Sequence, residues 1–350
     1  MAEFPKVEAF KGLNNRVDPI RLGMEWQLQA DNCLCDDASF LVRRPGITNN
    51  IGSGYKDVYG TRDGRLLAID SSDQLVQIDE AGDVQVLKTG ITGAPFQWAE
   101  LGYAIFLLGI NNYKWAVYPD QVITWGSLCP AVSASYPVGD PISYPPPNGN
   151  LIGTYRSQMV IAAWEPEFDR SVLYFSRPDY PHEFRFERDY QLFAGKITLL
   201  ADTADAFVIA TDRAIYLDGY DRVLARVAEY GVVPGGFLFD EYDTVWFWSE
   251  RGLCKAAPFE NITDRQLAIT ERKAVTGAVL TWQGSRYAVV QQIGDTSARR
   301  KVHSYDPLPV SNIMLANLHW KTWDLSFTGG PILIESNAAL TWPARVLSAS

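Results

Sequence analysis

Histidine is the side chain best suited to general acid–base chemistry or metal binding near neutral pH, and this chain has three, His182, His303 and His319. They lie far apart in the sequence, and none occurs in an H-E-x-x-H or H-x-H spacing that would suit a metal. His182 follows Tyr180 and Pro181 and is expected at the surface in a turn. His319 lies beside two tryptophans, which favours packing. The histidines therefore predict neither a catalytic base nor a metal site.

Paired carboxylates are the other candidates for catalysis, because glycoside hydrolysis needs two of them across a cleft. The chain has two clusters of acidic residues, one at 165–169 and one at 240–243, and the sequence around each is typical of a solvated turn. No G-x-S-x-G elbow, no glycine-rich phosphate loop and no Asp-box repeat is present. We therefore expect a protein that is not an enzyme and needs no cofactor, with a propeller glycoside hydrolase as the least favoured alternative. The carboxylates concerned are Glu165, Glu167 and Asp169 in one cluster and Asp240, Glu241 and Asp243 in the other.

Charge and cysteine content exclude several classes of protein. The formal net charge is −10, from 41 acidic and 31 basic residues, and such a surface repels phosphate backbones rather than binding them tightly. We expect a soluble protein, because no secretion signal and no apolar run of ~18 residues is seen. The four cysteines, Cys33, Cys35, Cys129 and Cys254, are too few and scattered for a disulfide framework and are expected to be reduced structural thiols.

The elements that would position these residues are short strands. The sequence holds 11 Trp, 17 Tyr and 16 Phe, and aromatic residues are enriched in strands. Strand-sized apolar runs alternate with short turns, and they fall into batches of about four strands with no convincing amphipathic helix between them. The batches cover residues 55–87, 96–125, 151–186, 197–228, 235–270 and 276–325.

Repeated four-stranded units of this size predict an all-β fold, a β-propeller of six blades over residues 51–350. A sandwich also uses many short strands, but it rarely holds so many in one domain. No WD40 or kelch signature is present. A Pro-rich insertion at 129–150 is expected as an extended, exposed connector between the second and third blades. The apolar segments 103–109, 158–164, 206–212, 243–249 and 285–291 are predicted to be buried second strands.

The N-terminal residues 1–50 form a separate arm and hairpin in this prediction. FKGLNNRVDPIRL, residues 10–22, combines glycine, asparagine and proline and favours extended or turn structure. The hairpin has a strand at 27–35, a turn at 36–39 and a return strand at 40–44. The arm either completes the last blade or braces a neighbouring subunit.

The segment Ala9 to Ile47, with its Leu-x-Arg-Arg-Pro-Gly exit, resembles the N-terminal region of tail nozzle, or tail-stabilisation, proteins of short-tailed bacteriophages. A weaker likeness lies at 201–219, where Thr211, Asp212, Tyr216 and Leu217 match a T-D-x-x-x-Y-L turn. The resemblance implies a structural protein of the virion tail, made in the host cytoplasm. It implies a ring, hexameric in that family, that contacts an adaptor or portal-side protein and tail fibres or a needle.

Further expectations concern what the ring does. The ring would form part of the DNA ejection conduit. It would make no contact with a membrane and would not bind DNA specifically. Its acidic surface would either let the DNA slide through or serve only to keep the protein soluble. The residues predicted to form the assembly interface are Leu13, Asn14, Asn15, Arg16, Arg43 and Arg44 in the arm and hairpin, and Tyr144 and Pro146 in the insertion.

A receptor- or glycan-binding propeller of a phage tail is the main alternative. The aromatic clusters Trp246-Phe247-Trp248 and Trp320-Lys321-Thr322-Trp323 could stack sugars. Alternation along a strand places Trp246 and Trp248 on the same face, however, which favours packing between blades.

Overall fold

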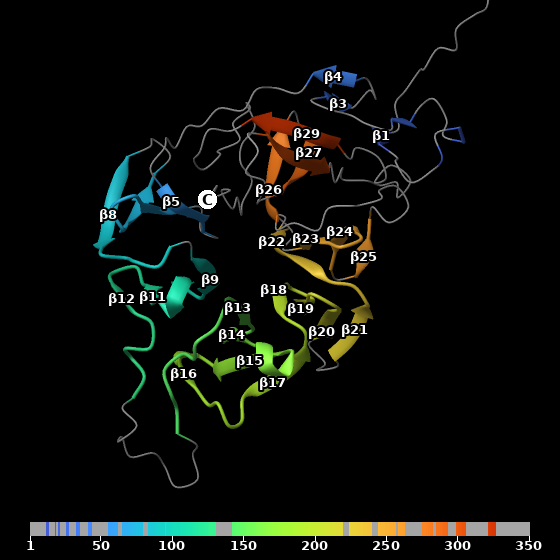
Figure 1. The fold of residues 1–350 in the computed structure, drawn as a ribbon. Coiled ribbons are helices and arrows are strands. Elements are labelled where there is room, and N and C mark those ends of the chain that lie inside the picture. The colour runs from blue at the N-terminus through green and yellow to red at the C-terminus, as the bar shows by residue number, and fades with distance from the viewer. Residues whose placement is uncertain are drawn as a thin grey trace, which may run out of the picture. The chain divides into compact units, whose positions relative to one another are not determined.

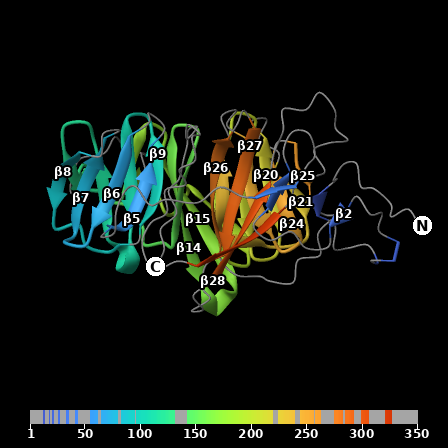
Figure 2. The same cartoon turned by 90° about the horizontal axis from the view of Figure 1, so that it is seen from above.

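The computed structural model is built almost entirely of β-strands (Figures 1 and 2). In the residues described below, the remaining regular structure is two short 3₁₀ helices, Ile110–Asn112 and Pro166–Phe168. No helix in this part of the chain is long and apolar enough to cross a membrane. The structure describes residues 55–61, 65–79, 83–94, 96–130, 142–219, 224–239, 244–256 and 258–262, residues 18, 20 and 21, and the backbone of strands at 12–13, 26–27, 33–35, 41–43, 275–282, 285–292, 299–305 and 321–326.

The chain divides into two compact units, one of residues 54–232 and one that combines 1–53 with 233–350. In the first unit each sheet consists of consecutive strands that pair antiparallel, and in the five-stranded third sheet β16 and β17 both pair with β15. The strands of its four sheets are β5 (Tyr55–Gly60), β6 (Leu66–Asp70), β7 (Gln74–Ile78) and β8 (Val84–Thr89); β9 (Gln97–Leu101), β10 (Ala104–Leu108), β11 (Lys114–Val117) and β12 (Val122–Thr124); β13 (Leu151–Tyr155), β14 (Gln158–Glu165), β15 (Arg170–Arg177), β16 (Tyr180–Phe184) and β17 (Tyr190–Ala194); and β18 (Ile197–Asp202), β19 (Ala206–Thr211), β20 (Ile215–Gly219) and β21 (Leu224–Ala228).

In the unit of residues 54–232, the second strand of each batch is largely buried, as its apolar sequence predicts. All five side chains of β10 and all six of β19 are buried, and so is the first part of β14. A strand with apolar side chains on both faces needs a neighbour on each side, because successive side chains point to opposite faces of a sheet. This prediction is confirmed for residues 104–108, 159–162 and 206–211, whereas Tyr103, at the start of the first segment, is 73% exposed.

Three hydrophobic clusters lie between consecutive sheets of this unit. Leu107 packs against β5–β7, whereas its neighbour Phe106 packs on the opposite face with Ile161 and Phe184. The third cluster joins Val160 and Leu173 to residues of β18 and β19. The first strands also lie side by side, with β13 against both β9 and β18 (Figure 1). Successive four-stranded sheets packed face to face are a propeller-like arrangement.

The second unit contains two further four-stranded antiparallel sheets. In the first of them Trp246 and Trp248 are buried, which confirms packing rather than exposure for this pair. Within the predicted N-terminal hairpin, residues 33–35 and 41–43 pair antiparallel with Cys35 opposite Leu41, whereas Gln27 belongs to another strand pair. The strands of this unit are β22 (Val232–Phe239), β23 (Val245–Ser249), β24 (Gly252–Lys255) and β25 (Glu260–Asn261); β26 (Val275–Trp282), β27 (Ser285–Gln292), β28 (Arg299–Tyr305) and β29 (Lys321–Ser326); the pair β3 (Cys33–Cys35) and β4 (Leu41–Arg43); and the parallel pair β1 (Gly12–Leu13) and β2 (Trp26–Gln27).

The Pro-rich insertion differs from its prediction over residues 142–150. Ser143 and Pro146 are buried. The backbone of Tyr144 exchanges two hydrogen bonds of 2.8 Å with Phe184, and its ring stacks on Phe186 at 5.1 Å. Pro145 and Asn148 are exposed as predicted, but the connector is not exposed throughout, because a proline ring that cannot join a ladder can still bury apolar surface against the sheet. Residues 131–141 lie outside the described part.

Candidate functional site

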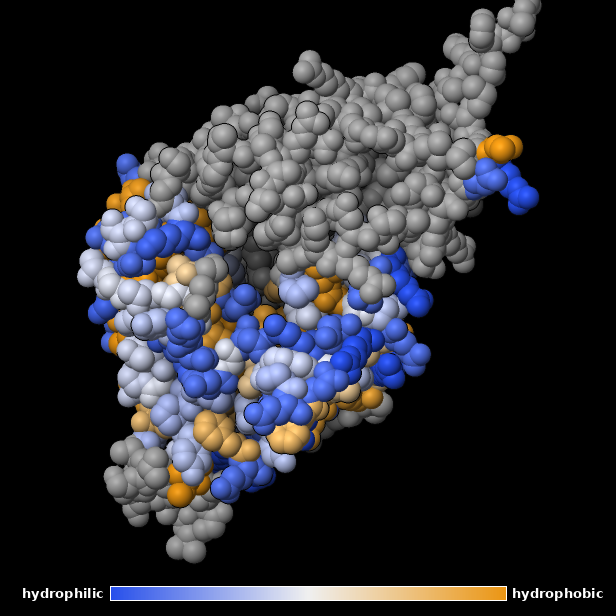
Figure 3. All heavy atoms as spheres, in the orientation of Figure 1, coloured by the Kyte–Doolittle hydropathy of each residue, from blue (hydrophilic) through white to orange (hydrophobic). Residues whose placement is uncertain are grey.

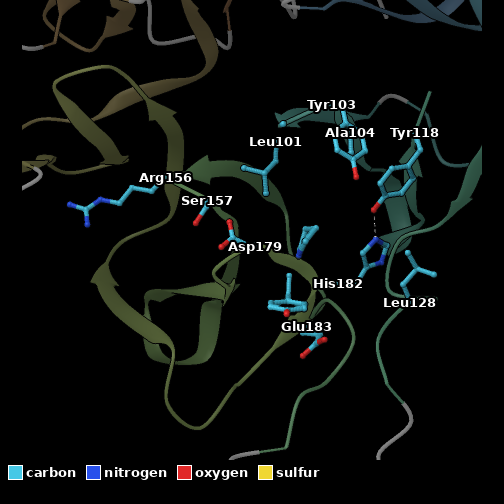
Figure 4. Close-up of a pocket in the computed structure, with 13 residues that line it drawn as sticks. Leu101, Tyr103, Ala104, Tyr118, Leu128, Arg156, Ser157, Asp179, His182 and Glu183 are labelled. Atoms are coloured by element: carbon cyan, nitrogen blue, oxygen red, sulfur yellow. Dashed lines mark hydrogen bonds between the residues drawn. The ribbon is translucent and has the colours of Figure 1, made fainter. Parts of the chain in front are cut away.

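A pocket of about 660 Å³ lies between the β9–β12 and β13–β17 sheets (Figure 4). Its position follows from the topology. In an antiparallel meander the first and third connections fall at the same end of the sheet, so the β9–β10, β11–β12, β13–β14 and β15–β16 turns of the two sheets meet there. The residues that matter for its chemistry are Tyr103, Tyr118, Asp179, Tyr180, His182 and Glu183.

His182 lies in β16 and is only 5% exposed. The turn after β12 packs over it: Gly126 N–H donates to His182 Nδ1 at 2.8 Å, and Trp125 Nε1–H donates to the carbonyl of Pro181 at 2.8 Å. The prediction of a surface histidine is wrong, because Gly126, whose N–H binds the ring, comes from the neighbouring sheet, 56 positions earlier in the chain.

The proton positions in this cluster can be assigned from its donors. Since Gly126 N–H donates to Nδ1, that nitrogen carries a lone pair, and the proton of neutral His182 lies on Nε2. Nε2 is 2.7 Å from Tyr118 Oη and donates to it. The hydroxyl hydrogen of Tyr118 is then left to donate to a partner in the pocket that its side chain lines.

Both side chains are held neutral. Burial lowers the pKa of His182, although Glu183 acts in the opposite direction. Burial raises the pKa of Tyr118, and Tyr103 adds to this rise. The pair therefore forms a neutral hydrogen-bond chain near neutral pH, since a protonated His182 would bring an N–H against the N–H of Gly126.

Aromatic rings form the rim of the pocket. Tyr103 is 73% exposed and Tyr180 is 51% exposed, and the Tyr103 ring lies 6.1 Å from that of Tyr118. Arg177 lies 4.6 Å over the Tyr180 ring and forms an ion pair of 2.6 Å with Glu183. This arginine both orients a rim tyrosine and balances the charge of a buried carboxylate.

A second carboxylate, Asp179, lies in the β15–β16 turn in a left-handed conformation, with φ of 63°. Its backbone N–H donates to the carbonyl of Ser157 at 3.0 Å, which ties this turn to the β13–β14 turn. Figure 4 shows the Asp179 and Ser157 side chains near each other, whereas the Arg156 guanidinium points away from the other labelled residues. The described face of the molecule carries hydrophilic and hydrophobic residues interspersed (Figure 3).

The carboxylates considered for catalysis do not line this pocket. Glu165 forms an ion pair of 2.7 Å with Arg170, and Asp169 forms one of 2.7 Å with Arg213. Glu167 is exposed in the 3₁₀ helix between them. Asp240, Glu241 and Asp243 lie outside the described residues. Among the residues that the structure describes, no group of three His, Cys, Asp or Glu is placed to hold a metal.

Few of the residues predicted for assembly can be located. Tyr144 and Pro146 contact the β13–β17 sheet and the turn after β12 of their own chain. Leu13 and Arg43 lie in β1 and β4, where only the backbone is described. Asn14, Asn15, Arg16 and Arg44 lie outside the described residues, as does His319, so the assembly role stays a prediction.

Three tyrosines of the pocket escaped the sequence analysis, although a signal for them exists. Tyr103, Tyr118 and Tyr180 each lie at or next to a hairpin turn of the same polarity in two consecutive batches. Turn positions normally carry small polar residues, so large aromatic side chains there mark a surface used for contacts.

Comparisons with known proteins identify no family for this chain. No protein-family model matches the sequence, and the search of curated proteins finds no match. Solved structures with a similar fold include the core factor of Saccharomyces cerevisiae, at 8% identity over 91% of this chain and 59% of that chain with a TM-score of 0.48. Hsv2 of Kluyveromyces marxianus is similar at 9% identity over 79% of this chain and 98% of that chain, with a TM-score of 0.37.

A further similar structure is YCF48 bound to a D1 peptide, at 9% identity over 84% of this chain and 91% of that chain with a TM-score of 0.37. Similarities this distant carry no functional argument. The sheets and their packing alone define the class of protein, an all-β chain with a propeller-like fold.

Proposed function

We propose that this chain is a structural subunit of a bacteriophage tail, of the nozzle class, in which six four-stranded sheets are the blades of one closed propeller and several copies assemble into a ring. The ring would form part of the DNA ejection conduit and contact adaptor-side and distal tail proteins. The net charge of −10 supports a conduit that DNA passes without binding.

The observation that carries the proposal is the exposed edge strand β8. Val84 is 51% exposed and Val86 is 49% exposed, and four other residues of the strand are exposed or half-buried. An outer strand with exposed apolar side chains and unpaired backbone groups is a template for pairing with another chain. Of the other strands in the fourth position of a sheet, β12 and β25 have three and two residues, whereas β21 and β29 have five and six.

The likeness of Ala9 to Ile47 to nozzle proteins supports the same proposal from a different part of the chain. An edge strand suited to contact a neighbouring copy and a terminal arm suited to brace one are both features of a ring subunit.

The first test changes the edge strand. Val86→Lys places a charge on β8 that disfavours pairing without entering the core, so we expect the variant to remain folded and to lose ring assembly. Size-exclusion chromatography with light scattering and negative-stain images measure this. The matched control is Phe168→Lys, which changes an apolar side chain that is 64% exposed outside the edge strands. A wild-type protein that stays monomeric at high concentration, or a Val86→Lys variant that forms rings normally, would contradict the proposal.

A further inference from the structure

We infer that the pocket between the β9–β12 and β13–β17 sheets binds an uncharged saccharide. This inference goes beyond the structural function proposed above and does not depend on ring assembly, because every residue that it uses lies in the unit of residues 54–232.

Hydrogen bonding is the first argument. The Tyr118 hydroxyl accepts from His182 Nε2 and keeps its own hydrogen for a partner in the pocket. Asp179 supplies carboxylate oxygens that only accept, and Ser157 beside it can do both. A sugar hydroxyl donates and accepts at once, so it can satisfy such a mixed set of groups.

The rim is the second argument. Tyr103 and Tyr180, which are 73% and 51% exposed, line the same pocket as the polar groups. The C–H face of a pyranose is apolar and slightly positive, and it packs on the negative face of an aromatic ring. A volume of about 660 Å³ lies in the range of pockets that enclose small ligands.

Charge selects a neutral ligand over an ionic one. Glu183 is paired with Arg177, and the tyrosine and histidine are uncharged in the hydrogen-bond chain. Arg156 also lines the pocket, but its guanidinium points away from the other labelled side chains (Figure 4), so Asp179 is the charged group that faces the polar cluster, and it disfavours an anion. An ammonium ligand would be attracted to that carboxylate, but it could not accept the hydrogen that Tyr118 offers, since an ammonium group has no lone pair.

The experiment measures binding to the full-length protein by saturation-transfer NMR. The probes are the methyl α-glycosides of glucose, galactose, mannose and rhamnose, with N-acetylglucosamine; N-acetylneuraminic acid and tetramethylammonium are the charged comparisons. We expect saturation transfer to at least one neutral probe. Tyr118→Phe should weaken its affinity about two- to tenfold, which corresponds to one neutral hydrogen bond.

Two further variants guard against misfolding. Tyr103→Ala changes a side chain that is 73% exposed, so it should leave the fold unchanged and still weaken binding. Tyr190→Phe, in β17 and outside the pocket, is the matched control and should bind as the wild type does. The inference is overturned if no neutral probe receives saturation, if Tyr118→Phe and Tyr103→Ala bind like the wild type, or if a charged comparison binds more tightly. Binding measured on Val86→Lys separates this result from the outcome for ring assembly, since that variant should bind normally.

Discussion

Asp57 shows how one buried residue joins two sheets. It lies in β5 and is 5% exposed, and its carboxylate accepts hydrogen bonds from Phe96 N–H at 2.6 Å and Trp98 Nε1–H at 2.9 Å at the start of the next sheet. Burial raises the pKa of Asp57 to about 6, although the hydrogen bonds from Phe96, Trp98 and Val58 act to lower it. The cost of removing the charged carboxylate from water is therefore larger than the stabilisation that it gains from its three hydrogen-bond donors.

This raised pKa makes the stability of the protein depend on pH. The unfolded carboxyl group loses its proton near pH 3.8 and the folded one near 6, so between these values the folded state binds more protons and stability falls as pH rises. Relative to Asp57→Asn, the wild type should gain about 2 kcal/mol of unfolding free energy from pH 7 to pH 4. Urea denaturation of both proteins at pH 7, 5.5 and 4 measures the change.

Asp83→Asn, which alters an exposed carboxylate of the same sheet, is the control for that titration. A difference between wild type and Asp57→Asn that stays constant over this pH range would refute the role given to burial.

The sequence could not reveal the environment of His182, and the reason is physical. Its neighbours along the chain, Tyr180 and Pro181, are typical of a turn, and local pattern carries no information on what packs over it. Its burial depends on Gly126 and Trp125, which another sheet supplies. By contrast, the burial of Trp246 and Trp248 was predictable because alternation within one strand decides it.

Strands were predicted correctly where both faces of the strand are buried, and they were missed where most of the side chains are exposed. The predicted batches 151–186 and 197–228 begin at the first residues of β13 and β18, and the latter batch ends at the last residue of β21, because their apolar runs stop at polar turns. β17 was missed, since three of its five side chains are exposed and its pattern is weak. β25 has two residues, Glu260–Asn261, and its place in the fourth position of its sheet is set by pairing with β24 alone.

The pocket depends on Gly126, in the turn after β12, because its N–H donates to His182 Nδ1. Its φ is +104°, and a Cβ there would lie 2.6 Å from Pro146 Cδ. Gly126→Ala should therefore lower the unfolding free energy by about 1 to 3 kcal/mol, from backbone strain and the clash together, and weaken saccharide binding through the lost His182 contact. Thermal and urea denaturation, followed by the binding measurement, test this.

Gly90→Ala is the matched control, because Gly90 also has a positive φ, +76°, but a Cβ there meets no atom within 4 Å. It should show the backbone strain without the clash, and it should bind the saccharide as the wild type does. Equal losses of stability in the two variants would show that the contact with Pro146 is unimportant.

At the scale of the molecule, the fold rests on sheets that bury one another. The described residues of the three hydrophobic clusters in the unit 54–232 belong to its own strands and turns. Sequence batches were enough to predict the sheets of this unit because the inner strands bury apolar side chains on both faces. The number of copies in an assembly is a different matter, since it depends on surface complementarity that a single sequence does not display.

This separation of core from surface leads to a prediction for the N-terminal arm. A protein that lacks residues 1–22 keeps every residue of the three clusters and of the pocket, so it should retain its far-UV circular dichroism and its saccharide binding. If the arm braces a neighbouring copy, the same deletion should shift the ring toward monomer at equal concentration, which light scattering measures. Rings that form normally without residues 1–22 would remove the arm from assembly and leave β8 as the proposed contact.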